Sequence, residues 1–594
     1  MTMDTSEDNK NFDMAFWVSI LFMVVALVLI GQGIFYPKHI KNMVAHGSYW
    51  VITFLVGVWL LLTFKSLLVE PIELHLKDKA FWVGVIVCVG LTGMVYVGVE
   101  NTFRVLSDET NLLAISKSLH VEKTIYNSTM GTWYYDSFHP ILREFPKRPI
   151  LFPYLTHVLH VLVGYSPHNS FLLNSLCLLA LLLSVFLMVL HRSNIFLGLL
   201  AVLLCFSQPI LSLSASSGGY DLCSMLFFFF MLWGALRQME YGTPLNGAWF
   251  WTTGVMFSYV RYESFAFFAF AFVVLTVTRH LRWDQIKAYL PIYAATPLWS
   301  LPYIGQRLST VGKYENPDDV SLFSVTRFVE HLEFMGKGLI NFDFSLPYNT
   351  VLNLVGLVCG LVLLVLWFLR KGPFQSRPAA LFGFLCGGCF AMQQVIFLSH
   401  HMGLYHHPTQ TRYFLGFCIA MALAPVCALC YASRRVLLAS VCAGVLLVAL
   451  YFPVAQEDAL GKTLVLNRKT RLVHHFLSQS VPPGALIIVS RPGQYAVFNY
   501  GAVNFSHARK SKKTLLNSFR RHIYPDMIVV QEMEYESQEP LEKEVLPKDY
   551  GLETLKEIQF TAKRWVRISR VVIPEPHSPK WRPTTPAMSN ATGL

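Results

Sequence analysis

The stretch Phe81 to Asn111, FWVGVIVCVGLTGMVYVGVENTFRVLSDETN, decides what kind of protein this is. Residues 81–99 carry no charged side chain, and their number is close to the about 20 apolar residues that an α-helix needs to cross a bilayer. Two adjacent acids, Asp108 and Glu109, follow this run within a few residues. The stretch therefore predicts a membrane-spanning helix that ends in a polar loop.

The composition of the whole chain agrees with a membrane protein. Of the 594 residues, 54% are hydrophobic and only 14% are charged, with a mean hydropathy of +0.45. So little charge excludes a cytosolic enzyme, because a soluble core cannot bury that much apolar surface. The net charge of +12 does not indicate nucleic acid, since the chain shows no basic stripe interleaved with aromatic residues. All eleven cysteines lie in apolar runs, which argues against a disulfide framework.

Further apolar runs of similar length predict about thirteen membrane helices. They are placed at 14–36, 49–69, 81–99, 170–190, 195–213, 219–236, 246–260, 263–278, 287–304, 351–369, 378–399, 413–432 and 435–453. The first run follows an acidic segment instead of a basic one and has no cleavage site after it, so it reads as a membrane helix and not as a signal peptide.

The distribution of lysine and arginine in the short connections predicts the orientation of these helices. One side carries Lys77, Lys79, Arg192, Arg237, Arg279, Arg282, Lys287, Arg370, Lys371, Arg377, Arg434 and Arg435, and the other carries Lys38, Lys41, Arg261 and Arg412. The side with twelve basic residues is expected to be cytoplasmic and the side with four to be outer. The N-terminus is then cytoplasmic, whereas loops 100–169 and 305–350 and the C-terminal tail lie outside.

The tail, residues 454–594, has a different composition, with twenty basic and thirteen acidic residues. Short β-type runs at Ala485–Ser490 and Met527–Gln531, separated by helical stretches, predict a small extracytoplasmic α/β domain over 454–575. Residues 576–594 are rich in Pro, Ser and Thr and are expected to be disordered.

Ionisable residues near membrane depth are costly unless they pair or function, and here they collect on the outer side. Asp108 and Glu109 are neighbours, so on a helix their side chains diverge by about 100° and only one faces a given cavity. A helix N-cap formed by Ser107 or Asp108 is an equally simple explanation for these acids. Further along, Lys147-Arg148-Pro149 opens an amphipathic stretch over 150–163, which is typical of a helix lying flat at the membrane interface.

These motifs resemble the GT-C glycosyltransferases, above all the protein O-mannosyltransferases and the lipid A aminoarabinose transferase. The resemblance rests on Leu106-Ser-Asp-Glu-Thr-Asn-Leu-Leu-Ala, Lys147-Arg148-Pro149, Ser214-Ala-Ser-Ser-Gly-Gly-Tyr-Asp221 and the pair Arg412-Tyr413. It implies a GT-C-like catalytic membrane domain over 81–453, and it leaves 1–80 as a segment with two additional membrane helices.

The resemblance implies transfer of a sugar from a polyprenyl-phosphate donor, with inversion, to an acceptor on the outer side (an EC 2.4-type reaction). Asp108 would be the catalytic base, with Glu109 in a supporting or metal-binding role. Arg148, or Lys147 if the register differs by one, would bind the lipid phosphate. Asp221 would orient the acceptor or share a divalent cation with Asp108, and no other cofactor is implied.

Two arginines have alternative interpretations. Arg261 contacts the sugar or the phosphate, or it simply pairs with Glu263. Arg412 is a second phosphate ligand, or its charge only reaches the interface from a helix end. The partners expected are a polyprenyl-phosphate sugar, membrane lipids and an acceptor that is a lipid, a protein or a polysaccharide, with no nucleic acid.

A bacterial inner membrane is the expected location, because the resemblance is closer to the bacterial lipid-modifying branch. The main alternative is a transporter or flippase, which usually shows repeated halves and broken helices around a midplane site. A polyprenyl-diphosphate-dependent glycan ligase is a second alternative, and it requires a larger cationic site. The outer acids and Arg148 favour the glycosyltransferase.

Overall fold

The computed structural model describes residues 5–35, 37–69, 78–134, 137–310, 323–460 and 464–573. The chain forms two compact units, one from residues 1–129 and 142–468 and the other from 130–141 and 469–594. The segment 576–594, expected to be disordered, lies outside the described residues.

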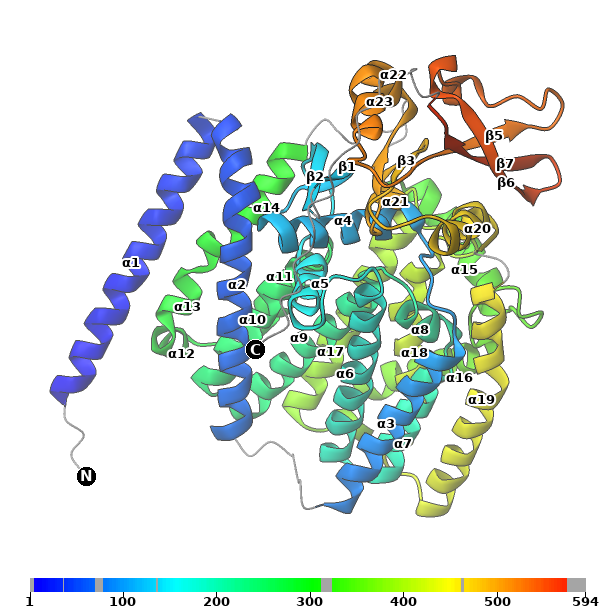
Figure 1. The fold of residues 1–594 in the computed structure, drawn as a ribbon. Coiled ribbons are helices and arrows are strands. Elements are labelled where there is room, and N and C mark those ends of the chain that lie inside the picture. The colour runs from blue at the N-terminus through cyan, green and yellow to red at the C-terminus, as the bar shows by residue number, and fades with distance from the viewer. Residues whose placement is uncertain are drawn as a thin grey trace, which may run out of the picture. The chain divides into compact units, whose positions relative to one another are not determined.

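The first unit is helical (Figure 1). Its helices are α1 (Thr5–Phe35), α2 (Pro37–Val69), α3 (Lys79–Gly98), α4 (Leu106–Glu122), α5 (Leu151–Val163), α6 (Asn169–Arg192), α7 (Ile195–Phe206), α8 (Pro209–Ala215), α9 (Asp221–Tyr241), α10 (Pro244–Ser258), α11 (Ser264–Val277), α12 (Trp283–Ala288), α13 (Leu290–Ala294), α14 (Thr296–Thr310), α15 (Val325–Leu339), α16 (Thr350–Phe368), α17 (Arg377–Ser399), α18 (Leu415–Ala428) and α19 (Arg434–Leu460), with 3₁₀ turns η1 (Gly372–Phe374) and η2 (Thr411–Phe414).

The protein is a polytopic helical membrane protein. Among the described residues, 8 helices are long and apolar enough to span a membrane, or 9 if the bent pair α7 and α8 counts as one span. This is fewer than the about thirteen expected from apolar runs of bilayer length. The runs at 246–260 and 263–278 are helices of only 15 and 14 residues, and the apolar part of α1 is short. The run at 287–304 is broken between α13 and α14.

Small residues allow the helices to approach closely, as is usual in membrane bundles. Phe186 of α6 packs against Gly84 of α3 and Gly198 of α7, and a Cβ at Gly84 would come within 2.0 Å of its ring. The three helices run side by side (Figure 1). A Cβ at Gly356 of α16 would lie 2.2 Å from the carbonyl oxygen of Met421, so α16 and α18 also meet backbone to backbone.

A sharp break between α7 and α8 precedes the site. The two helices meet at 75°, which removes backbone hydrogen bonds that buried side chains must replace. Asn349 donates from Nδ2 to the carbonyl of Ser207 at 3.2 Å, and its backbone N–H donates to Gln208 at 3.1 Å. Gln208 in turn donates to Asn353 at 2.8 Å. This network holds α8 so that the chain emerges at the loop 216–219 before α9.

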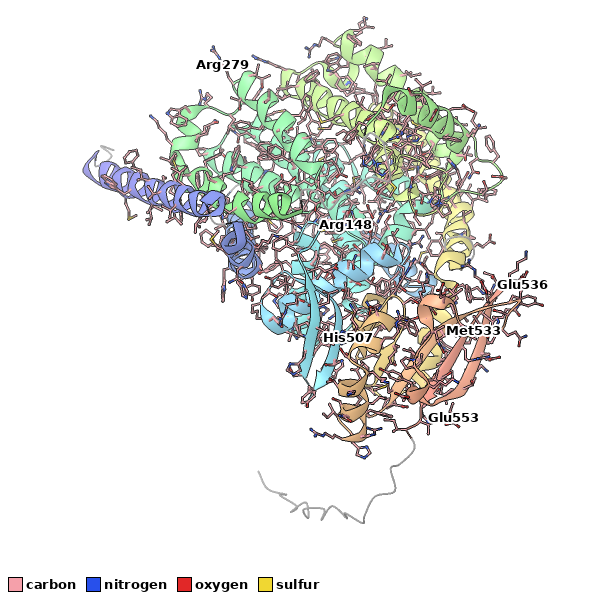
Figure 2. The ribbon with its side chains drawn as sticks, turned by 90° about the horizontal axis from the view of Figure 1, so that it is seen from above. Arg148, Arg279, His507, Met533, Glu536 and Glu553 are labelled. Carbon is pink, nitrogen blue, oxygen red and sulfur yellow. The ribbon has the colours of Figure 1, made fainter. Side chains whose placement is uncertain are left out.

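The second unit is built on a mixed seven-stranded sheet of order β2-β1-β4-β3-β5-β7-β6. Its strands are β1 (Asn127–Tyr134), β2 (Ser137–Glu144), β3 (Leu486–Ile488), β4 (Gly501–Val503), β5 (Met527–Glu534), β6 (Leu552–Thr561) and β7 (Arg564–Val571); its helices are α20 (Leu464–Ser480), α21 (Gly493–Ala496), α22 (Phe505–Lys510) and α23 (Lys512–Arg520), with turns η3 (Glu542–Glu544) and η4 (Lys548–Tyr550). The β-runs expected at 485–490 and 527–531 are confirmed as β3 and β5. Figure 2 labels His507 on α22 and Met533 on β5.

Part of the first loop belongs to this sheet. Residues 130–141 fall in the outer loop 100–169, and residues 130–134 and 137–141 lie in the neighbouring strands of the hairpin β1–β2, where Gly131 pairs with Ala502 of β4. Gly131 is required there because a Cβ would come within 2.4 Å of the Phe138 ring. The sheet of the second unit therefore draws on two distant parts of the sequence.

Candidate active site

Asp108 lies in the first turn of α4 and is held between two arginines. Its Oδ1 accepts from Arg148 Nη2 at 2.5 Å and its Oδ2 accepts from Arg412 Nη2 at 2.9 Å. The N-cap of α4 is Val105, which makes no side-chain cap hydrogen bond, so Asp108 is not the cap. Burial would raise the pKa of this carboxyl, but the charges of Arg148 and Arg412 outweigh burial and hold the pKa below its usual value. Asp108 is therefore an ionised, doubly paired carboxylate.

Glu109 points away from this arginine pair, as expected for adjacent residues on a helix. It is 2% exposed, and its carboxylate accepts from three backbone N–H groups: Val105 at 3.0 Å, Arg104 at 3.2 Å and Gly218 at 2.8 Å. Burial raises the pKa of Glu109 although these N–H groups oppose the rise. The Gly218 bond ties the start of α4 to the loop that precedes α9.

That loop, residues 216–219, is built from small residues because it fits into a narrow space. A Cβ at Gly218 would lie 2.8 Å from the Phe103 ring and 3.2 Å from Glu109. Asn174 of α6 donates to the carbonyls of Ser217 at 2.7 Å and Gly219 at 2.8 Å. The loop is thus fixed from two sides, and α9 begins directly after it at Asp221.

Arg148 is positioned through its backbone. Gln306 of α14 donates to the carbonyls of Pro146 at 3.0 Å and Arg148 at 2.5 Å, and the hydroxyl of Tyr262 donates to the carbonyl of Lys147. Arg148 lies among the helices of its unit, whereas Arg279 is at the margin (Figure 2). The Lys147 side chain is exposed, so of the two candidate phosphate ligands Arg148 is the one that reaches Asp108.

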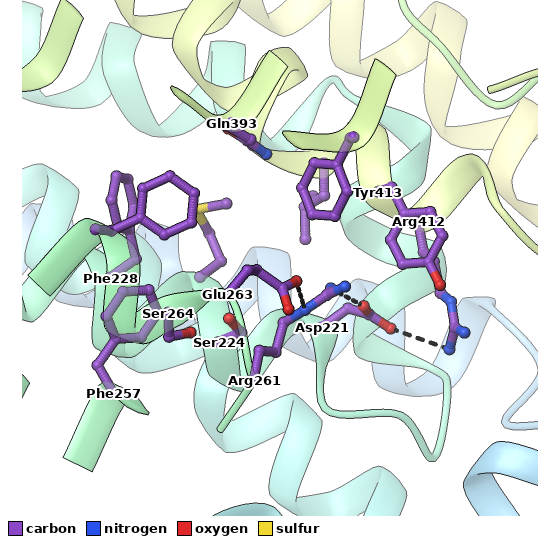
Figure 3. A pocket seen from close by; sticks show the side chains of 15 residues that line it. Asp221, Ser224, Phe228, Phe257, Arg261, Glu263, Ser264, Gln393, Arg412 and Tyr413 are labelled. Carbon is purple, nitrogen blue, oxygen red and sulfur yellow. Dashed lines mark hydrogen bonds and ion pairs between the residues drawn. The ribbon is translucent and has the colours of Figure 1, made fainter. Parts of the chain in front are cut away.

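Asp221 is the second carboxylate of the site. It accepts from Arg261 Nη1 at 2.6 Å and lies 3.6 Å from Arg412 Nη1, and Arg261 also pairs with Glu263 at 2.5 Å (Figure 3). The Arg261 guanidinium is within 5.5 Å of the ring centroids of Tyr220, Phe397 and Tyr413. With two acids and three rings around it, Arg261 fixes Asp221 and has little capacity left for a ligand.

A pocket opens beside these charges. Asp221, Arg261, Glu263 and Arg412 form its charged part, as Figure 3 shows. The rest of the wall is mostly apolar: Met225, Phe228, Phe257, Phe267, Phe397 and Leu415. The pocket therefore offers charge and apolar surface to one ligand, which suits an amphiphile with an anionic head.

The two carboxylates do not fit a shared divalent cation in this arrangement. The Arg412 guanidinium bridges them, 2.9 Å from Asp108 and 3.6 Å from Asp221, and its charge would repel a metal ion at that position. Within the described ranges, no group of three or more His, Cys, Asp or Glu side chains could hold a metal ion. The Arg412 guanidinium supplies the positive charge between Asp108 and Asp221 that a shared metal ion would otherwise supply.

The structure brings Asp108, Arg148, Asp221, Arg261 and Arg412 into one connected set of ion pairs. Three contributors were missed by sequence reasoning. Gln306 and Asn174 act on backbone groups distant in sequence, and no pattern in the chain marks them. The ring of Tyr413 beside Arg261 had a signal, because Tyr413 is half of the Arg412-Tyr413 pair.

Comparison with solved structures identifies the fold. The apo structure of ArnT from Cupriavidus metallidurans superposes with a TM-score of 0.50 at 13% identity, covering 83% of this chain and 98% of that chain. The chain has an ArnT-like fold. ArnT from the same organism bound to undecaprenyl phosphate matches with a TM-score of 0.49 at 14% identity, covering 83% and 99%, and the Archaeoglobus fulgidus oligosaccharyltransferase with 0.41 at 12%, covering 76% and 68%.

The match to the apo ArnT structure agrees with the fold that the sequence motifs led us to expect. No protein-family profile and no curated protein matches the sequence itself. The ArnT-like fold includes the helical membrane unit and the C-terminal mixed-sheet unit.

Proposed function

We propose that this protein is an inverting glycosyltransferase that moves a sugar from a polyprenyl-phosphate donor to a hydroxyl acceptor on the outer side of the membrane. The observation that carries the proposal is the Asp108 carboxylate held by Arg148 and Arg412 beside a pocket with a largely apolar wall. Arg412 both pairs with Asp108 and lines the pocket, so the base and the anion site adjoin a lipid-compatible surface. The ligand of the ArnT complex, undecaprenyl phosphate, has the same chemistry as the proposed leaving group.

The reaction is a single displacement. The acceptor oxygen bonds to the anomeric carbon of the donor while Asp108 takes the hydroxyl proton. The bond between the anomeric carbon and the phosphate oxygen breaks, and its electron pair leaves with the polyprenyl phosphate. Arg148 and Arg412 stabilise the charge that develops on the phosphate. A phosphate is a good leaving group, so the general acid of two-carboxylate glycosidases is not required.

The remaining residues of the site act on these groups. Arg261 holds Asp221, and Asp221 lies against Arg412, so these two residues orient the guanidinium that faces Asp108. Glu109 holds the loop before α9 through Gly218. We assign Arg261, Asp221 and Glu109 as positioning residues, and Asp108, Arg148 and Arg412 as the groups that contact substrate.

The test is reconstitution of the purified protein with a panel of synthetic polyprenyl-phosphate sugars and candidate acceptors. Wild-type protein is expected to release polyprenyl phosphate with one donor, and Asp108→Asn to lose that release. Asp284→Asn is the matched control, because Asp284 is an exposed acid whose side chain is 68% accessible. Undiminished release by Asp108→Asn would remove Asp108 as the base.

The same panel separates the alternatives. Movement of a lipid-linked sugar across the vesicle membrane without release of polyprenyl phosphate would replace the proposal with a flippase. Turnover only of a diphosphate-linked glycan would replace it with a ligase. The acceptor class and the sugar follow from which combination turns over.

A further inference from the structure

The charges of the site cancel within the protein. Arg148, Arg261 and Arg412 face three carboxylates, those of Asp108, Asp221 and Glu263. They are joined by the ion pairs Arg148–Asp108 at 2.5 Å, Arg412–Asp108 at 2.9 Å, Arg412–Asp221 at 3.6 Å, Arg261–Asp221 at 2.6 Å and Arg261–Glu263 at 2.5 Å. A lipid phosphate that binds these arginines therefore has to compete with a carboxylate that is already there.

Of the three carboxylates, Asp108 is the one that an incoming anion can displace from its arginine partners. Asp221 and Glu263 are anchored by Arg261, whose guanidinium is 11% exposed and surrounded by aromatic rings. Arg148 is 31% exposed, so the Arg148–Asp108 pair is the most accessible contact of the set. Arg412 also has a buried Nε that donates no hydrogen bond to any described residue, which leaves it a donor for a new anion.

A carboxylate in this position is a poor base, because each of its oxygens already accepts from a guanidinium. A phosphate offers more acceptor oxygens than a carboxylate and matches the fork of an arginine side chain. Exchange of one anion for the other at the arginines would leave the oxygens of Asp108 free for an acceptor hydroxyl.

We infer that Arg148 and Arg412 form one anion site with two alternative occupants, the Asp108 carboxylate in the free protein and the lipid phosphate after the donor has bound. This inference rests on the proposed function and adds an order to it: the donor binds first, and its phosphate releases the base. During the reaction Asp108 becomes neutral as it takes the acceptor proton, so the arginines then act on the departing phosphate alone.

If the Asp108 carboxylate and the lipid phosphate compete for the same arginines, the Asp108 variants should show opposite effects on binding and on turnover. Removing the competing charge should strengthen binding of undecaprenyl phosphate while abolishing turnover. The probe is undecaprenyl phosphate titrated into protein in nanodiscs, with undecaprenol as the lipid that lacks the phosphate. Asp108→Asn and Asp108→Ala are expected to bind undecaprenyl phosphate about tenfold more tightly than wild type, the loss of one charge-assisted competitor.

Two controls separate competition from a general change in charge. Asp108→Glu keeps the competing carboxylate and should not bind more tightly than wild type. Asp284→Asn removes a distant exposed charge and should bind like wild type. Each variant is first checked for a monodisperse elution profile. Two neutral variants, Asp108→Asn and Asp108→Ala, are compared so that the conclusion does not depend on the folding of a single substitution.

The outcomes are distinct. Weaker or unchanged binding in both Asp108→Asn and Asp108→Ala, with wild type binding undecaprenyl phosphate in preference to undecaprenol, overturns the exchange and leaves the proposed function standing. Equal binding of undecaprenol and undecaprenyl phosphate by wild type removes the phosphate site, and with it both proposals. Tighter binding in both neutral variants, with Asp108→Glu unchanged, supports the exchange.

Discussion

Asp108 of α4 and Arg412 of η2, the turn just before α18, are 304 positions apart in the chain, yet the carboxylate and the guanidinium lie 2.9 Å from each other. The Arg412 guanidinium also faces Asp221, so one side chain joins the beginning of α4 to the beginning of α9.

Loss of either arginine that faces Asp108 should reduce turnover strongly. Arg148→Gln and Arg412→Gln each remove a cation from the phosphate and are expected to lower kcat about 10²- to 10³-fold, as for other groups that stabilise developing charge. Lys147→Gln should have a small effect, because the Lys147 side chain is exposed. Steady-state release of polyprenyl phosphate measures all three, with Arg435→Gln, an exposed arginine of α19, as control. A full rate in Arg148→Gln would contradict the phosphate role.

The buried Glu109 should matter for stability as well as for activity. Glu109→Gln replaces one acceptor oxygen with an amide that faces backbone N–H groups, which costs about 1–3 kcal/mol of unfolding free energy. A single amide oxygen cannot accept from all three N–H groups, which weakens the tie between loop 216–219 and α4, so turnover should fall in parallel. Thermal unfolding in detergent measures the first effect. The exposed ion pair of Glu240 with Arg192 provides the comparison, and Glu240→Gln should shift the midpoint little.

Chelation should leave the reaction intact. Because Arg412 bridges Asp108 and Asp221, its guanidinium already supplies a positive charge between the two acids. Activity measured after EDTA treatment and dialysis is expected to equal that of untreated protein, and added Mg²⁺ or Mn²⁺ to give no stimulation. Activity that disappears with EDTA and returns with one metal would show that the acids bind a cation after all.

The second unit should loosen at mildly acidic pH. His474 of α20 lies against the rings of Tyr495 and Phe498, and its Nε2 is 3.1 Å from the carbonyl oxygen of Gln494. Burial lowers the pKa of His474 to about 4, although the Gln494 carbonyl opposes this. As pH falls below the ordinary pKa of histidine, His474 therefore binds a proton in the unfolded chain before it does so in the folded one. The contribution of the neutral, buried His474 to stability is fully present above that pKa and is lost as pH falls to about 4.

The loss should reach about 2 kcal/mol, after allowance for the partial exposure of the ring. Hydrogen exchange of residues 469–573 in the intact protein, compared at pH 7 and pH 5 after correction for intrinsic rates, measures it. His474→Gln keeps a donor for Gln494 and should remove most of the pH dependence. The neighbouring exposed His475, changed to Gln, should not.

Much of the site could be predicted because its parts are short local patterns. Asp108 and Arg148 each lie close to a helix start that the local sequence predicts. Asp221 begins α9 after a run of small residues. The partners could not be predicted in the same way. Glu109 accepts from the Gly218 N–H, and Gln306 donates to the carbonyl of Arg148. Both bonds join segments that are distant in sequence and that no periodicity connects.

The same distinction between local patterns and long-range contacts applies to the fold. Composition and apolar runs predicted a polytopic membrane protein, and β-type runs predicted the strands β3 and β5. The number of spans was less accessible, since an apolar run such as 246–260 forms a 15-residue helix that no longer has bilayer length. Residues 130–141 gave no indication of their partner, because pairing of Gly131 with Ala502 is set by the tertiary structure and not by local sequence.

The hairpin β1–β2 has a consequence for how the protein is made. It leaves the ribosome before every helix from α5 onward, whereas β4, the strand it pairs with, is translated after α19 and α20. Through most of synthesis the edge of β1 therefore has no partner strand, a state in which unpaired strands invite aggregation. Nascent chains arrested before residue 501 should expose the hairpin to protease, and completion of translation should protect it. Biogenesis of this protein would then depend on whatever shields an early strand until its late partner arrives.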